Sequence, residues 1–207
     1  MFKLISYLEE HKGKYKPFKA YALKELGIAF AQLGSFDIAH EHFKSSINLL
    51  NELYPKGHFI LGRTLFMKGR AEWLAGDYAQ AKKTFPLVLD VYQKHYGEDH
   101  LEVAKVNFHI AKVALSENRL QEAEKLYTAA LGVFEREKYL SRSSVLKDLS
   151  NLYFKKSQLI KDRDPKLSEI YKSKAIDYIK NSLKIAQESY PKDSPRLKKL
   201  ESKLKAL

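Results

Sequence analysis

An internal repeat with a period of 42 residues limits what this chain can fold into more than any other feature of its sequence. The segments 34–50, 76–92 and 118–134 align without a gap. In each, a residue that tolerates a positive φ is followed five positions later by Ala and nine positions later by an aromatic residue. The aligned sets are Gly34, Gly76 and Asn118; Ala39, Ala81 and Ala123; and Phe43, Phe85 and Tyr127. Units of this kind bury their apolar faces by stacking on similar neighbours.

Each unit has the pattern of two antiparallel helices. Gly34 and its equivalents lie where the first helix stops and the chain turns, a position that favours a positive φ. An upstream column of small residues, Gly27, Gly69 and Ala111, lets the second helix approach closely. The aromatic residue lies four positions beyond the repeated Ala, on the same helix face. The predicted helix pairs are 18–33 with 36–53, 59–75 with 78–95, 100–116 with 120–137, and 142–161 with 165–190, with further helices near 2–11 and 195–206.

The fourth unit departs from the period. Its small residue is Ser150 and its Ala is Ala175, so these columns are 25 residues apart instead of 12. Asp164 before Pro165 is typical of a helix start, because the carboxylate caps free N–H groups and Pro suits the first turn. The pattern predicts a hairpin in which both helices are lengthened.

Two smaller features also have structural interpretations. Pro86 falls inside the predicted second helix of the second unit, where it removes a backbone hydrogen bond, so we expect a kink near residues 82–86. The linkers repeat as well, since 54–58 lies 42 residues before 96–100. This places His100 at a helix start, a structural position, and favours that interpretation over a metal site beside Glu98 and Asp99.

The Ala-x-x-x-aromatic pattern on the second helix, seen most clearly in 122–131, resembles the tetratricopeptide repeat. The 42-residue period and the linker at 96–104 are similar to the kinesin-light-chain variety of this repeat. The resemblance implies an all-α, right-handed superhelical solenoid of about four helix pairs with a C-terminal capping helix. The implied divisions are an N-terminal helix in 1–17, repeats in 18–53, 54–95, 96–137 and 138–190, and the capping helix in 191–207.

Composition and motifs argue against catalysis. The chain has no Cys, which excludes disulfides and thiolate metal sites and is compatible with a reducing compartment. No apolar run approaches the roughly 20 residues of a membrane span, and 1–5 is too short for a secretory signal. We find no combination of nucleophile, base and orienting group, and no phosphate-binding glycine loop. We therefore expect a cytoplasmic protein that is no enzyme and carries no cofactor or metal.

In this family the first helix of each pair lines a concave surface, so the resemblance also implies a binding groove. Counted from the small-residue column, the residues predicted to bind a peptide are Lys24, Arg63, Phe66, Arg70, Trp73, Lys105, Phe108, Lys112, Lys147 and Asn151. Cations between aromatic rings suit an acidic peptide or protein segment with a bulky apolar anchor. The alternatives are that the aromatic residues, Trp73 included, belong to the core and that the cations form a solvated face.

The leading interpretation is a protein–protein interaction scaffold, and two others stay open. One is a peptide-sensing regulatory receptor. The other is nucleic-acid binding through the basic C-terminal part, because residues 138–207 hold 18 basic and 8 acidic residues. The basic residues that would contact phosphates are Arg196, Lys198, Lys199, Lys203 and Lys205. A homodimer through an open array end is also left open.

One known binding mode of the family fits poorly. Related repeats that hold the C-terminal carboxylate of chaperones use five polar positions on three consecutive first helices. Lys24 and Lys105 match two of these positions, whereas Ile28, Met67 and His109 occupy the others. The sequence therefore gives little support to a carboxylate clamp of that kind.

Overall fold

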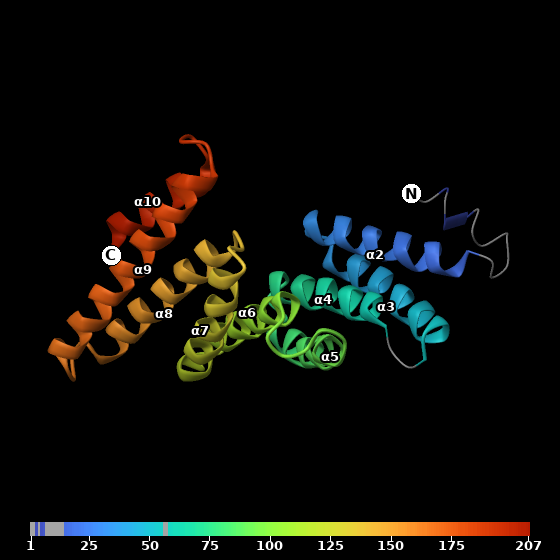
Figure 1. The fold of residues 1–207 in the computed structure, drawn as a ribbon, viewed down its shortest axis with the longest axis horizontal. Coiled ribbons are helices and arrows are strands. Elements are labelled where there is room, and N and C mark those ends of the chain that lie inside the picture. Colours follow the sequence, from blue (N-terminus) through green and yellow to red (C-terminus); the bar gives the residue numbers. More distant parts are fainter. Residues whose placement is uncertain (1–2, 4, 7–14, 56–57) are drawn as a thin grey trace. The chain divides into compact units, whose positions relative to one another are not determined.

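The computed structural model describes residues 3, 5–6, 15–55 and 58–207, and these form helices and connecting turns without a strand. They belong to two compact units, Met1–His109 and Ile110–Leu207. The helices are α2 (Lys16–Gln32), α3 (Phe36–Leu53), α4 (Phe59–Leu74), α5 (Tyr78–Tyr96), α6 (Leu101–Ser116), α7 (Leu120–Arg136), α8 (Arg142–Ile160), α9 (Pro165–Ser189) and α10 (Pro195–Ala206) (Figure 1). The all-α prediction is confirmed, and these helices start and end within two residues of the predicted positions. The helix predicted near 2–11 lies mostly outside the described residues.

The first helix of each of the first three pairs ends in the same backbone turn. Gly34, Gly76 and Asn118 have φ angles of 78°, 81° and 63°. The next residue donates its N–H to a carbonyl five positions back, as in Ser35 N to Phe30 O at 2.9 Å. This is the hydrogen-bond pattern of a Schellman cap, and it confirms the predicted positive φ at all three positions.

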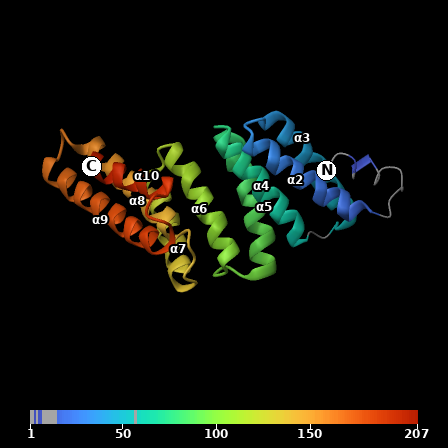
Figure 2. The same ribbon diagram turned by 90° about the horizontal axis from the view of Figure 1, so that it is seen from above.

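In the first unit, the small-residue column works as a site of close contact. α2 packs on α3, and α4 packs on α5, so each pair forms a hairpin (Figure 2). A Cβ placed on Gly27 would lie 2.9 Å from the Phe43 ring, and one on Gly69 would lie 2.9 Å from Phe85 Cε1. Both rings are fully buried. The absence of a side chain therefore sets how near the two helices of each hairpin come.

A second contact column lies seven residues before the first. In the first hairpin, the buried Ser46 hydroxyl donates to Ala20 O at 2.7 Å. In the fourth, the Ser182 hydroxyl donates to Ser143 O at 2.7 Å, and the Ser143 hydroxyl to Ser182 O at 3.0 Å. Ser46 and Ser182 occupy the same place in their hairpins, seven residues after the aligned Ala39 and Ala175. Paired hydroxyls thus hold α8 against α9 at the position where the second repeat has Gly62.

The two repeated linkers start their helices in the same way. His58 Nδ1 accepts from Ile60 N at 3.2 Å, and His100 Nδ1 accepts from Glu102 N at 3.1 Å. Each imidazole also stacks on the Tyr at the start of its linker, with ring centroids 4.5 Å and 4.4 Å apart. The structural role predicted for His100 is confirmed.

The lengthened fourth hairpin is also as predicted. α8 and α9 contain 19 and 25 residues and run side by side (Figure 1). Asp164 Oδ1 accepts from Leu167 N at 3.0 Å, with Pro165 as the first residue of α9. In the first unit, α5 continues through Pro86 as one helix, and the proline is exposed.

Candidate functional site

In the first unit, α2 and α4 are adjacent, as expected of consecutive first helices. Lys24 on α2 belongs to the interior, because only 4% of its surface is exposed. Its Nζ lies 2.8 Å from a carboxylate oxygen of Glu25 and 4.2 Å from the centroid of the Tyr21 ring. Lys24 is therefore already neutralised and covered within its own helix.

Two arginines on α4 are in a different situation. Arg63 and Arg70 are both exposed, and neither forms an ion pair with a carboxylate of the described residues. The Arg70 guanidinium lies 6.0 Å from the Phe66 ring centroid and contacts Met67 Sδ at 3.6 Å. Trp73, one turn further, is half-buried. This face of α4 presents two cations beside apolar side chains.

Two of the three predicted aromatic residues, Phe66 and Phe108, belong to the core, which is the alternative that the sequence left open. Phe66 packs edge-on against Phe85, with centroids 6.2 Å apart, and against His109, at 5.1 Å. Phe108 is also buried. Lys105 on α6 is half-buried and pairs with Glu102 at 2.6 Å. These residues stabilise the first unit, and their rings present little surface to a ligand.

In the second unit, the predicted cations surround a carboxylate that the prediction overlooked. Asp148 on α8 is 5% exposed; its Oδ1 lies 3.2 Å from Lys147 Nζ, and its Oδ2 lies 3.7 Å from Lys112 Nζ. Asn151, one turn further, is half-buried. Burial raises the pKa of Tyr127, and the charge of Asp148 adds to this shift. A signal for Asp148 was present, because it follows the buried Val145 by three residues and so lies on the core side of α8.

A second, half-buried charge cluster joins α7 to α8. The Tyr153 hydroxyl and the Lys156 amine both donate to the Glu124 carboxylate. Burial raises the pKa of Glu124, but these two hydrogen bonds and the nearby cations outweigh it and hold the pKa below its usual value. Burial, the Glu124 hydrogen bond and its charge raise the pKa of Tyr153. The cluster is internally satisfied, so it holds the helices together.

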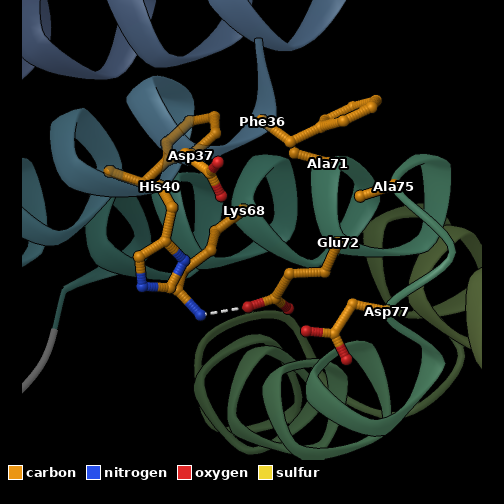
Figure 3. Close-up of a pocket in the computed structure, with 9 residues that line it drawn as sticks. Phe36, Asp37, His40, Lys68, Ala71, Glu72, Ala75 and Asp77 are labelled. Atoms are coloured by element: carbon orange, nitrogen blue, oxygen red, sulfur yellow. Dashed lines mark hydrogen bonds and ion pairs between the residues drawn. The ribbon is translucent and has the colours of Figure 1, made fainter. Parts of the chain in front are cut away.

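A pocket of about 210 Å³ in the first unit was not predicted from the sequence. Figure 3 shows it between the start of α3, the second half of α4 and the turn before α5. Glu72, 7% exposed, accepts from Lys68, and Lys68 also donates to Thr84 on α5 at 3.3 Å. Asp37 and Asp77 contribute further carboxylates. The Lys68 contacts tie α4 to α5, which gives the cluster a structural role.

Comparison with known proteins agrees with the fold and with the repeat. Residues 61–136 match the model of the Tetratricopeptide repeat family. The chain is similar in structure to BtubC (BKLC) from P. vanneervenii, with a TM-score of 0.75 and 18% identity over 99% of this chain and 77% of that one. It is also similar to a Podosopora anserina protein of nearly identical TPR-like repeats, named for the kinesin light chain, with a TM-score of 0.65 and 15% identity over 91% of this chain and 84% of that one. A single-residue variant of the same protein gives a TM-score of 0.66 at 14% identity, over 92% and 94% of the two chains. No curated protein matches the sequence significantly.

Residues 61–136 therefore form a tetratricopeptide-repeat segment, and the described residues as a whole have the all-α fold of proteins with such repeats. The solved structural neighbours of the chain are of the kinesin-light-chain-like kind, which confirms the resemblance seen in the sequence. Proteins with this fold are typically scaffolds for protein–protein interaction, and the family is generally non-catalytic. In the described part of the chain, no helix combines the length and apolar character that a bilayer crossing requires.

Proposed function

We propose that this protein is a non-catalytic scaffold that binds an acidic peptide or protein segment with an apolar anchor, and that it does so in the cytoplasm. The observation that carries the proposal is the exposed pair Arg63 and Arg70 on α4, which no carboxylate of the described residues neutralises. Trp73 and the stem of Met67 supply apolar surface beside them. Arginine suits this role because its planar guanidinium binds carboxylates through two parallel hydrogen bonds.

The spacing of the two arginines sets the length of segment that both would bind. They are seven residues apart, so they lie on one face of α4 and about 10 Å apart along its axis. An extended chain covers that distance in about three residues. A short ligand with acidic groups separated by two or three positions and one large apolar side chain is therefore the best fit.

The proposal is tested by selecting peptides from a displayed random library on the wild-type protein and measuring their affinity by fluorescence anisotropy. Selected peptides should be acidic and should contain a large apolar residue. The variant Arg63→Glu/Arg70→Glu should bind these peptides more than about tenfold more weakly, since both charge contacts become repulsive.

The matched control is Lys44→Glu/Lys83→Glu, which makes the same change in net charge on the exposed faces of α3 and α5. This control should change affinity by no more than about twofold. Selection without acidic enrichment, or equal losses in the two double variants, would contradict the proposal.

A further inference from the structure

A pocket of about 350 Å³ lies between α8 and α10, both in the second unit. Its polar lining comes from Ser144 and Lys147 on α8 and from Arg196 and Lys199 on α10, and Leu200 forms an apolar wall. The cations Arg196, Lys199 and Lys203 repeat at helical spacing along α10. Ser144 and Lys147 have the same spacing along α8. The pocket therefore lies between a cationic stripe on α10 and a polar stripe on α8 that contains Lys147.

Arg196 is held in place by neutral groups. Its Nη2 donates to Ser144 Oγ at 2.6 Å, and its Nη1 donates to Tyr190 Oη at 2.9 Å. The guanidinium also lies 5.0 Å from the Tyr190 ring centroid. None of the carboxylates in the described residues forms an ion pair with it. These contacts fix the orientation of the guanidinium while its positive charge stays uncompensated.

Of the two lysines that line the pocket, Lys147 has a carboxylate partner, whereas Lys199 forms no ion pair with a described residue. Asp148 already pairs with Lys112 and Lys147. Burial lowers the pKa of Lys203, the charge of Lys147 lowers it further, and Asp148 partly opposes this. Like charges brought together at a helix interface destabilise the fold unless an anion lies among them. The pocket is therefore built with more positive charge than its own side chains neutralise.

We propose that this pocket binds a single anionic group, a phosphate or a carboxylate, carried by a partner polypeptide. Arg196 and Lys199 would contact the anionic oxygens, with Lys147 as a third cation. The inference rests on the proposed scaffold function in one respect only, that the anion belongs to a polypeptide. A nucleic acid is less suitable, because its backbone needs cations spread along an exposed track, whereas these converge on one cavity.

The pocket itself is tested with inorganic phosphate. Melting temperature is compared in sodium phosphate and in sodium chloride of equal ionic strength. Phosphate should raise it for the wild type and for Lys198→Gln/Lys205→Gln, which removes two exposed charges of α10 that do not line the pocket. Most of this gain should be lost in Arg196→Gln/Lys199→Gln. If that variant fails to fold, Lys147→Gln/Lys199→Gln keeps the Arg196 hydrogen bonds and should show the same loss. Equal gains in all variants would overturn the proposal.

The source of the anion is tested with three versions of one library-derived peptide, carrying phosphoserine, glutamate or alanine at one position. A phosphate or carboxylate ligand predicts about tenfold weaker binding of the alanine version to the wild type and no such difference in Arg196→Gln/Lys199→Gln. If the phosphoserine peptide binds more tightly than the glutamate peptide, the anionic group is a phosphate. If the two peptides bind with equal affinity, it is a carboxylate. A single-stranded oligonucleotide that binds more tightly than the peptides, and loses affinity equally in both double variants, would overturn the proposal in favour of a diffuse basic surface. Because these variants leave Arg63 and Arg70 intact, failure here is separate from failure of the α4 site.

Discussion

The α4–α5 hairpin of the first unit and the α8–α9 hairpin of the second solve the same packing problem in different ways. Gly62 makes room for the Tyr92 ring by having no side chain, whereas Ser143, in the equivalent position, exchanges hydrogen bonds with Ser182. Their cations differ too. Arg63 and Arg70 are exposed on α4, but Lys147 on α8 is paired with the buried Asp148. The comparison shows that one repeat pattern provides both a solvent-facing charge and a charge set into a pocket.

The largest effect is expected at the buried carboxylates. Asp148→Asn leaves Lys112 and Lys147 without their shared counter-ion, and should cost about 3 kcal/mol of unfolding free energy. Glu72→Gln should cost about 1 kcal/mol, because Lys68 keeps its hydrogen bond to Thr84. Urea denaturation measures both. Equal losses of unfolding free energy in the two variants would contradict the larger role that Asp148 has as the counter-ion of two lysines. Asp148→Asn should also increase the stabilisation by phosphate.

Glycine contacts should be the next most sensitive. Gly69→Ala forces a methyl group against the Phe85 ring and should cost about 1–3 kcal/mol. Gly132→Ala, in α7, is the matched control, because apart from the adjoining backbone of its own helix no described residue lies within 4 Å of the new Cβ. It should stabilise the protein by about 0.5–1 kcal/mol, since alanine favours the helix. Changes of the same sign in the two variants, measured by urea denaturation, would refute the close-contact role of Gly69.

The serine pair should have a smaller effect. Ser182→Ala removes a buried hydroxyl that donates to Ser143 O and should cost about 1 kcal/mol. Ser143→Ala/Ser182→Ala should cost less than the sum of the single changes, because the two hydroxyls also contact each other at 3.1 Å. A double-mutant cycle in guanidinium chloride checks this. Strict additivity would indicate that the hydroxyls act independently.

The smallest effect concerns the pH dependence that Lys203, on α10, gives to the stability of the protein. Because the pKa of Lys203 is lowered from 10.5 in the folded protein, the unfolded chain binds more protons between the lowered pKa and 10.5. The contribution of this group to stability should therefore rise with pH across that window. Lys203→Met should be more stable than the wild type at pH 7, and this difference should shrink as pH increases. A difference that grows with pH, in urea midpoints, would contradict the crowding of Lys203 by Lys147.

The repeat made the fold predictable because its signals are local. Gly34 and Asn118 mark turns by backbone conformation, and Asp164 with Pro165 marks a helix start, so each could be read within a few residues. The burial of Phe66 and Phe108 is harder to predict from the sequence. Counting from the small-residue column fixes the helix face, but one residue covers about 100° of a helix, so the border between groove and core is one position wide.

The charge contacts of the second unit could not be read from the sequence. Arg196 meets Ser144 across 52 positions, which depends on where α10 packs after the lengthened hairpin. The sequence predicts Lys147 as a binding residue, but its pairing with Asp148 depends on which side chains of α8 are buried. The excess of basic residues in the C-terminal part is visible in the sequence, but only the structure brings Arg196, Lys199 and Lys147 to one pocket.

The most direct test is the affinity of one library-selected acidic peptide for the wild type and for the variant in which both α4 arginines become glutamate. We predict that the dissociation constant rises by more than about tenfold at physiological salt, while the far-ultraviolet circular dichroism stays unchanged. An unchanged dissociation constant in a folded variant would mean that α4 does not bind the acidic segment.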